Sequence, residues 1–306
     1  MLDTFYRWIW NCVTSDIFWL SPKRCILLAP PKKVGIGQPP LSQQIRSLEE
    51  ELGAPLFRRV PRGVELTDSG KVFLPEAQAI LAQAERAKKI ARRGARGELG
   101  RLRLGFTSSA AFTRIVQNTI RVFRENYPNV QLTLEEEDTT TLLEGLSEQI
   151  LDAAFIRPGR NDPDGVQVHR LFEETMMIAL PSDHRLVQAS ALPLSAVAKE
   201  RFLLFPRGAG PGFFDEIISA CRRAGFEPRM GYEAPQITSV GNMIAAGLGI
   251  SIVPISIASQ VCVAGVKYLK IIGDAPKASI ALAIRPDEQS VTAEKFVTLA
   301  KGFKSK

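Results

Sequence analysis

The stretch that most constrains the fold spans residues 38–74 and reads QPPLSQQIRSLEEELGAPLFRRVPRGVELTDSGKVFL. Its first half carries apolar residues at Leu41, Ile45, Leu48 and Leu52. Steps of four, three and four residues place them on one face of a helix. Two prolines stand where the first turn tolerates missing N–H groups, and a glycine follows where a C-terminal cap belongs. The pattern therefore predicts a short amphipathic helix.

The opposite face of this helix is polar and carries Ser42, Gln43 and Arg46. Such a face can lie in the major groove of DNA, where glutamine reads adenine edges and arginine reads guanine or phosphate. A basic turn between two short predicted strands follows, made of Arg58, Arg59, Pro61, Arg62 and Gly63. This turn would touch the DNA backbone beside the groove. The alternative is an ordinary solvated helix followed by a hairpin.

The run QPPLSQQIRSLEEELGAPLFRR…RGVELTDSG resembles the second half of the winged helix-turn-helix of LysR-type transcriptional regulators, and the downstream elements recur in that family's order. The resemblance implies a recognition helix and wing over residues 38–66. It also implies a homo-oligomer, a dimer or a tetramer, that binds double-stranded operator DNA without a cofactor. The expected groove contacts are Gln38, Pro39, Ser42, Gln43 and Arg46, and the expected backbone contacts are Arg59, Arg62 and Thr67.

Residues 1–37 do not follow the pattern of the rest of the chain. They hold all three tryptophans and two of the four cysteines, and prolines interrupt any regular pattern. A LysR-type protein would place two supporting helices here. A signal peptide or membrane anchor is the alternative, but Asp16 interrupts the apolar stretch and no convincing cleavage site follows.

A change of reading frame accounts for this segment. When residues 14–32 are back-translated and each codon is read from its third base, permitted codon choices give LRHFLVVAEEMHFARAAE. That string resembles the start of a LysR-type DNA-binding domain and leads into KVGIGQPPLSQQ. Loss of one adenine from the codons of Lys32 and Lys33 would rejoin the frames. We therefore expect residues 1–32 to be out of frame and DNA binding to be impaired in the chain as written; chance resemblance is the alternative.

A long helix is predicted over residues 67–96. Thr67 can cap it, and Asp68 adds a negative charge to its first turn. Small and apolar residues recur at heptad-like steps, at Phe73, Ala77, Ile80, Ala84, Ala87 and Ala91. The resemblance makes this the linker helix that pairs two subunits, and Pro75 is expected to kink or loosen it. The alternative is a lone amphipathic helix packed on its own subunit.

From residue 101 onward, strands and helices alternate, which favours an α/β fold of parallel sheets covered by helices. The predicted strands are 102–106, 130–134, 152–157, 175–180, 201–205, 249–254 and 279–284. The predicted helices are 110–126, 140–150, 213–224, 239–246 and 292–303. The resemblance implies a bilobal effector domain like a periplasmic solute-binding protein. Its subdomain I would comprise 101–171 and 277–306, and its subdomain II 172–276.

Polar residues stand at the carboxyl ends of predicted strands, where α/β sheets bind ligands. Thr107, Ser108 and Ser109 join a strand to a helix, so that hydroxyls and backbone N–H groups converge in a way that suits a carboxylate. The alternative is that Thr107 and Ser108 only cap the helix. Arg157 ends another strand and could pair with an anion or form a salt bridge with an aspartate.

The family resemblance adds further residues to this cleft. They are Ser109, Thr139, the loop residues Phe205, Pro206 and Arg207, and the apolar wall residues Phe213 and Ile237. Residues 208–212 are glycine-rich but lack the GK[ST] of a phosphate loop, so they are expected to form flexible cleft lining. Within the family the sequence is most similar to regulators of aromatic-compound catabolism, whose effectors are small carboxylic acids.

The composition of the chain narrows the classes of function that remain. The chain has 39 Lys and Arg against 32 Asp and Glu, and its first 100 residues hold 16 of the basic and 10 of the acidic side chains. The basic excess thus falls on the predicted DNA-reading module. Four cysteines without CxxC spacing suit a reducing cytoplasm, two histidines are too few for a metal cluster, and no apolar run could span a bilayer.

Two other functions stand beside a DNA-binding regulator. A bilobal solute-binding protein with an N-terminal anchor would fractionate with membranes and ignore DNA, but it has no reason to carry a recognition helix and wing. An enzyme on the same fold would need a nucleophile–His–acid set, metal spacing or a nucleotide loop, and the sequence shows none. We therefore expect a non-enzymatic regulator in which a small carboxylate changes subdomain closure and thereby operator binding.

Overall fold

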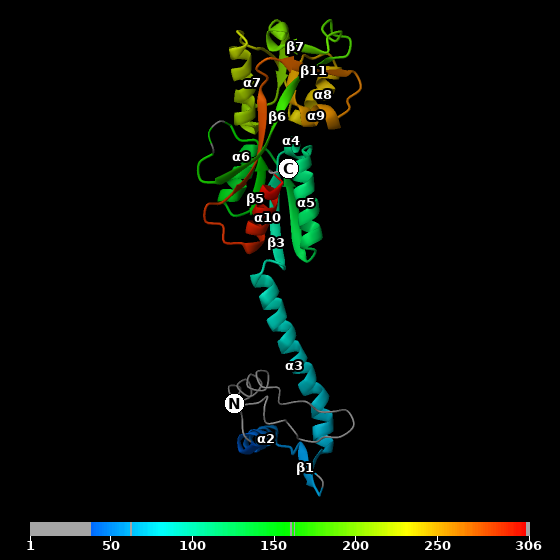
Figure 1. The fold of residues 1–306 in the computed structure, drawn as a ribbon, viewed down its shortest axis with the longest axis vertical. Coiled ribbons are helices and arrows are strands. Elements are labelled where there is room, and N and C mark those ends of the chain that lie inside the picture. Colours follow the sequence, from blue (N-terminus) through cyan, green and yellow to red (C-terminus); the bar gives the residue numbers. More distant parts are fainter. Residues whose placement is uncertain (1–37, 62, 160, 162, 304–306) are drawn as a thin grey trace. The chain divides into compact units, whose positions relative to one another are not determined.

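The computed structural model describes residues 38–61, 63–159, 161 and 163–303 (Figure 1). The segment expected to be out of frame and the predicted wing residue Arg62 therefore lie outside the described residues. The chain divides into two compact units, Met1–Arg93 and Gly94–Lys306, and each is described by itself.

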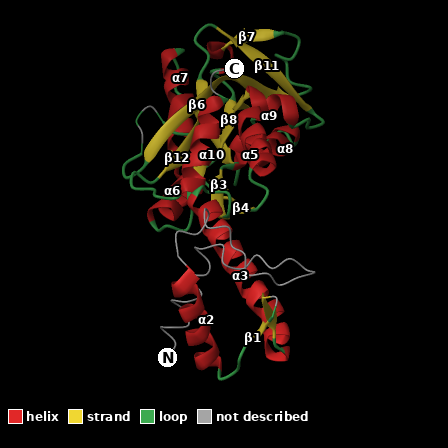
Figure 2. Ribbon diagram, turned by 60° about the horizontal axis from the view of Figure 1, so that its bottom comes forward, coloured by secondary structure: helices red, strands yellow, loops and turns green. Residues whose placement is uncertain are grey.

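The first unit contains helix α2 (Gln38–Leu52), strands β1 (Phe57–Val60) and β2 (Gly63–Leu66), and most of helix α3 (Asp68–Ala95). The predicted amphipathic helix is thus present as α2, and a short loop joins it to β1 (Figure 2). Gly53 follows α2 with a φ of 65°, the left-handed conformation that a C-terminal cap requires. Strands β1 and β2 form an antiparallel hairpin.

Glu49 ties α2 to the hairpin. Its Oε1 accepts hydrogen bonds from the backbone N–H groups of Leu56, at 2.6 Å, and Phe57, at 2.9 Å. Leu48 and Leu56 are each only 3% exposed and belong to the small core of this unit. A Cβ on Gly70 would lie 2.1 Å from the carbonyl oxygen of Leu56, so only glycine allows α3 to approach the hairpin this closely.

Helix α3 begins with the predicted cap. The Thr67 hydroxyl accepts a hydrogen bond from Gly70 N–H at 3.0 Å and donates one to the carbonyl oxygen of Pro55 at 2.5 Å. Pro75 is exposed and lies inside α3, which continues through it. In the predicted apolar stripe, Ala77 is buried whereas Ile80 is 43% exposed.

The second unit is built on an eight-stranded sheet with the order β4-β3-β5-β12-β6-β11-β7, in which β10 also pairs with β6; β8 and β9 form a separate pair. The strands are β3 (Gly100–Phe106), β4 (Val130–Glu136), β5 (Ala153–Ile156), β6 (Gln167–Pro181), β7 (Ala191–Pro193), β8 (Arg201–Leu204), β9 (Arg229–Glu233), β10 (Ser251–Pro254), β11 (Val266–Ile272) and β12 (Lys277–Ile284). The helices are α4 (Ser108–Ala111), α5 (Arg114–Asn126), α6 (Thr139–Ser147), α7 (Pro211–Arg223), α8 (Val240–Ala245), α9 (Ile255–Gln260) and α10 (Val291–Gly302), with short 3-10 turns η1 (Leu194–Val197), η2 (Arg207–Ala209) and η3 (Ile237–Ser239).

Strands β6 and β12 run antiparallel along each other and connect two lobes (Figure 1). We call the part with β3, β4, β5, α5, α6 and α10 lobe I, and the part with β8 to β11 and α7 to α9 lobe II. The expectation of purely parallel sheets is wrong, because the chain enters lobe II along β6 and returns along β12. The parallel pairs are β3 with β4, β3 with β5, β7 with β11 and β8 with β9.

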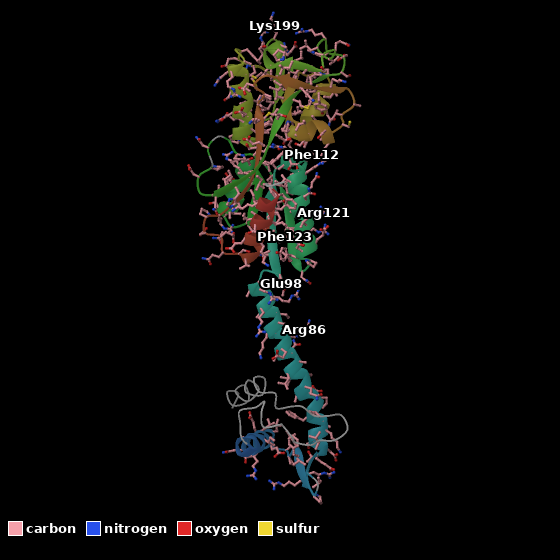
Figure 3. The ribbon with its side chains drawn as sticks, viewed as in Figure 1. Arg86, Glu98, Phe112, Arg121, Phe123 and Lys199 are labelled. Atoms are coloured by element: carbon pink, nitrogen blue, oxygen red, sulfur yellow. The ribbon has the colours of Figure 1, made fainter. Side chains whose placement is uncertain are left out.

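Each lobe has its own apolar core. In lobe I, Phe123, Phe155 and Phe296 form edge-to-face contacts with ring centroids 5.1 and 5.8 Å apart (Figure 3). The core of lobe II includes Phe202 and Ile217, both fully buried. No helix in the described part of the chain is long and apolar enough to span a membrane.

Most predicted elements of this unit are present, but their limits differ in two informative places. The helix predicted over 110–126 is divided into α4 and α5, because Thr113, at the N-cap position of α5, adopts an extended backbone conformation. The predicted subdomain limit at 171/172 falls inside β6, which continues from one lobe into the other. Strands β7, β9 and β11 and helix α9 were not predicted.

Candidate functional site

A cavity of about 160 Å³ lies where the two lobes meet. Lobe I contributes the ends of β3, β4 and β5 and the start of α6, and lobe II contributes the loop after β8, the start of α7 and η3. Eight of the ten predicted effector residues line this cavity: Thr107, Ser108, Ser109, Thr139, Arg157, Phe205, Phe213 and Ile237. The structure thus brings together residues that are up to 130 positions apart in the sequence.

Arg157 forms the polar centre of the cavity wall. It follows β5, whose four residues are all buried, so its guanidinium lies inside the protein and is only 3% exposed. Its Nε donates to Ser109 Oγ at 2.7 Å, and its Nη2 donates to the Ser109 carbonyl oxygen at 3.1 Å and to Glu174 Oε1 at 2.9 Å. The predicted salt bridge therefore exists, but with a glutamate on β6 and not with an aspartate.

Glu174 is also held from lobe II. Its Oε2 accepts a hydrogen bond from Ser256 N–H at 2.8 Å, and its Oε1 accepts one from the Ser256 hydroxyl at 3.0 Å. Burial lowers the pKa of Arg157, and the negative charge of Glu174 opposes that shift. An arginine remains protonated in a protein, so the buried guanidinium keeps its positive charge beside Glu174.

Three buried polar atoms of the cavity wall have no hydrogen-bond partner among the described residues: Arg157 Nη1, Thr107 Oγ1 and Thr139 Oγ1. Unsatisfied buried polar groups are rare in native proteins because each costs about 1–3 kcal/mol. Thr107 occupies the N-cap position of α4 but makes no side-chain capping bond. The capping alternative therefore does not account for its hydroxyl, and all three atoms stay unsatisfied within the described residues.

The backbone N–H groups at the predicted anion site are less available to a ligand than the sequence analysis predicted. Helix α4 has only four residues, so it offers little of the dipole that a longer helix would direct at a carboxylate. At the start of α6, the Asp138 side chain already accepts the Thr141 N–H at 2.8 Å. The unpartnered polar groups of this cavity are therefore the Arg157 guanidinium and the hydroxyls of Thr107 and Thr139, with little contribution from a helix dipole.

Two predicted residues, Pro206 and Arg207, do not line the cavity. Arg207 forms a two-pronged ion pair with Asp215 on α7, with both N···O distances at 2.7 Å, and its side chain is 64% exposed. The loop turns after Phe205 into η2, and this turn directs Arg207 to solvent. The glycine-rich segment does contribute Gly210 to the wall.

Sequence reasoning missed several residues of this site. Glu136, Glu137 and Asp138 line the cavity, and an acidic run directly after a predicted strand is a signal that could have indicated them. Glu174 and Ser256 had no such signal. Their roles arise because β6 and α9 pack together beside Arg157, and no local pattern encodes that contact.

The lobes also touch directly beside the cavity. The Thr140 hydroxyl on α6 donates to the Gly208 carbonyl oxygen at 2.8 Å. The Gln260 side chain on α9 donates to the carbonyl oxygen of Phe112, which follows α4, at 2.5 Å (Figure 3). Gly159 and Gly212 approach so closely that a Cβ on Gly212 would lie 2.1 Å from Gly159 N. These contacts join the two lobes, and a change in lobe spacing would break them.

The predicted DNA contacts lie in the first unit. Gln43 and Arg46 are exposed on α2, and Arg59 is exposed on β1. The backbones of Gln38, Pro39 and Ser42 lie in α2, while their side chains lie outside the described part of the structure. The Thr67 hydroxyl is engaged within this unit, because it donates its proton to the Pro55 carbonyl oxygen and accepts the Gly70 N–H in the first turn of α3.

Comparison with known proteins gives two family matches. Residues 95–303 match the LysR substrate binding domain, and residues 32–71 match the bacterial regulatory helix-turn-helix protein, lysR family. The regulator BudR of Raoultella terrigena is 38% identical over 266 residues, which cover 87% of this chain and 91% of BudR.

Solved structures agree with these matches. The LysR family regulator CbnR in complex with its target DNA superposes with a TM-score of 0.77 at 25% identity, covering 98% of this chain and 99% of CbnR. The BenM effector binding domain with its effector benzoate gives a TM-score of 0.59 at 26% identity, covering 67% of this chain and 92% of that domain.

These matches decide between the functional classes. A helix-turn-helix of the lysR type has no place in a solute-binding protein, and the matched relatives are named as transcriptional regulators and not as enzymes. The helix-turn-helix match begins at residue 32, so the motif is present from there onward. The chain belongs to the LysR family of DNA-binding transcriptional regulators, with the effector-binding domain that characterises them.

Proposed function

We propose that a small carboxylate binds in the cavity beside Arg157 and thereby switches the binding of this regulator to its operator. The observation that carries the proposal is the set of unpartnered buried groups, Arg157 Nη1 and the hydroxyls of Thr107 and Thr139. A carboxylate has two oxygens that accept hydrogen bonds, and a charged acceptor forms stronger bonds than a neutral one. Binding would therefore satisfy donors that the protein leaves free.

The volume of the cavity matches that of a small ligand. A buried space of about 150 Å³ holds one benzene molecule in other proteins, and this cavity measures about 160 Å³. Phe205, Phe213 and Ile237 supply an apolar wall opposite the polar groups. A single ring or a short branched chain with one carboxylate would fill it. The benzoate complex of the related BenM domain supports this class of ligand.

Ligand binding would act on the contact between the lobes. Thr107, Ser109 and Arg157 belong to lobe I, whereas Phe205 and Phe213 belong to lobe II. A ligand that touches both sets stabilises one degree of closure relative to others, and only such differential binding can shift a conformational equilibrium. In an oligomer, this shift would change the angle at which paired DNA-binding units meet the operator.

We further propose how the remaining parts of the chain contribute. Residues 38–66 would read DNA through α2 and the hairpin, as the complex of CbnR with its target DNA supports. Residues 67–96 would pair subunits, and the effector domain, with subdomain I at 101–171 and 277–306 and subdomain II at 172–276, would add a second contact in a dimer or tetramer. Such a regulator would work in the cytoplasm and needs neither cofactor nor metal.

The variant Thr139→Val tests the carboxylate site, because valine keeps the shape of threonine and removes only the hydroxyl. Calorimetry on the full chain with benzoate and related acids should show binding weakened by about tenfold, since a hydrogen bond to a charged group contributes about 1.5–3 kcal/mol. The free energy of unfolding should not fall, because this hydroxyl has no partner within the described protein.

The control is Thr298→Val on α10, whose hydroxyl bonds the Glu294 carbonyl oxygen at 2.9 Å, away from the cavity. It should bind the same acids as well as the parent chain. The proposal fails if no small carboxylate binds the parent, or if Thr139→Val and Thr298→Val bind a carboxylate equally well.

A further inference from the structure

The mouth of the cavity is acidic. Glu136 ends β4, and Glu137 and Asp138 follow it before α6; all three line the cavity. Among the described residues of the lining, Arg157 is the only one that carries a positive charge. A carboxylate ligand would therefore enter past three negative charges to reach one cation.

The charge of Arg157 is already balanced inside the protein. Its Nη2 lies 2.9 Å from Glu174 Oε1, in an ion pair whose side chains are 3% and 1% exposed. The free Nη1 still offers one directed hydrogen bond, but the pair contributes little net positive potential. The field across the cavity is consequently set by the acidic mouth.

Two of the three carboxylates at the mouth are available to a ligand. Asp138 is engaged with the first turn of α6, where it accepts the Thr141 N–H. The backbone of Glu137 is fixed by its N–H, which donates to the Phe106 carbonyl oxygen at 3.3 Å. Within the described residues, neither Glu136 nor Glu137 has an ion-pair partner, so both can interact with a cationic group.

These observations point to a ligand with two charges of opposite sign. The polar wall formed by Arg157, Thr107 and Thr139 suits a carboxylate, and the mouth formed by Glu136 and Glu137 suits an ammonium group. A second carboxylate would instead face Glu136 and Glu137, and juxtaposed like charges oppose binding. The apolar wall leaves space for a hydrocarbon side chain.

We propose that the effector is a small amino acid with an apolar side chain, and that Glu136 and Glu137 select it over simple carboxylic acids and dicarboxylic acids. This proposal rests on the proposed function, since it requires that a carboxylate binds beside Arg157. It adds a preference for an ammonium group, which Arg157, Thr107 and Thr139 alone do not provide.

Matched pairs of ligands test it on the full chain by calorimetry. The pairs are leucine with 4-methylpentanoate, and phenylalanine with 3-phenylpropanoate, because each pair differs only in the ammonium group. Each amino acid should bind at least about fivefold more tightly than its partner acid, the strength of one or two solvent-accessible ion pairs. Adipate, a dicarboxylate, should bind more weakly than 4-methylpentanoate.

The variants Glu136→Gln and Glu137→Gln should each reduce this preference and should leave binding of the plain acids unchanged or stronger. Glu135→Gln is the matched control, because Glu135 precedes them on β4 but does not line the cavity. It should retain the preference of the parent chain.

The possible failures are distinguishable. If the plain acids bind as tightly as the amino acids, or if the double variant of Glu136 and Glu137 keeps the preference, the selectivity proposal is overturned while the carboxylate site stands. If no member of either pair and no other carboxylate binds, the proposed function fails and this inference fails with it.

Discussion

The side chain of Arg157 both forms a buried ion pair and keeps one unpartnered N–H group. One edge of its guanidinium bonds Glu174 and Ser109, and Nη1 has no hydrogen-bond partner among the described residues. Removing one partner of a buried ion pair costs about 3–5 kcal/mol, because the other charge is left buried and unpaired. An Arg157 variant would therefore report on folding as much as on ligand binding. Removal of single hydroxyls or of the exposed glutamates at the mouth separates the two effects.

Gly212 marks the closest approach of the lobes, and its replacement by alanine should disturb their closure. The new Cβ would lie 2.1 Å from Gly159 N and 2.2 Å from its Cα, which are backbone atoms that cannot rotate away. We expect Gly212→Ala to lower the free energy of unfolding by about 1–3 kcal/mol, the usual cost of overpacking. Chemical denaturation and effector titration measure the two consequences, and the effector should bind more weakly.

Gly208→Ala is the control for this substitution. Gly208 lies in the same segment, but a Cβ there would meet no atom within 4 Å. Its stability and ligand affinity should match those of the parent chain. Equal behaviour of the two alanine variants would show that the contact between Gly159 and Gly212 does not govern lobe closure.

At the scale of elements, contacts within the first unit hold helix α2 in place. Glu49 bonds the start of the hairpin, and the small core includes Leu48 and Leu56. Helix α3 approaches the hairpin through Gly70. These contacts occupy the inner side of α2, while Gln43 and Arg46 remain exposed.

Arg46→Ala should weaken operator binding, because a base or phosphate contact of an arginine contributes about 1–3 kcal/mol. Footprinting on a chain with restored reading frame would show the loss, at a salt concentration held constant. Arg121→Ala is the control, since Arg121 is an exposed arginine on α5 that pairs with Glu125 at 3.2 Å. An unchanged footprint for Arg46→Ala would remove this residue from the DNA-reading surface.

At the scale of the whole molecule, regulation requires that effector binding and DNA binding share one chain. The family matches cover both functions, from residue 32 to residue 71 and from residue 95 to residue 303. The effector domain contains its own cores and its own cavity.

Resequencing the genomic DNA that encodes residues 11–41 tests the change of frame. We expect one adenine fewer at the codons of Lys32 and Lys33, because the shifted reading resembles the start of a LysR-type DNA-binding domain. The corrected chain should then bind operator DNA, in a gel-shift assay, more tightly than the chain as written. An unchanged genomic sequence would show that residues 1–37 are genuine and would assign the resemblance to chance.

The sequence by itself determined the local features of this protein. The spacing of Leu41, Ile45, Leu48 and Leu52 predicted α2, and Thr67 predicted the start of α3. Alternation of apolar and polar stretches located most strands and helices of the effector domain. Such patterns are readable because periodicity and capping act between residues that are near each other in the chain.

Only the tertiary structure decided which of the candidate side chains meet. It placed Thr107, Thr139 and Arg157 around one cavity, directed Arg207 outward to Asp215, and brought Glu174 and Ser256 to Arg157. It also paired β6 with β12 in antiparallel fashion, against the expected parallel sheet. These outcomes depend on packing between segments that are distant in the sequence. Burial and hydrogen bonding at such contacts are decided by neighbours in three dimensions, which a local sequence pattern does not predict.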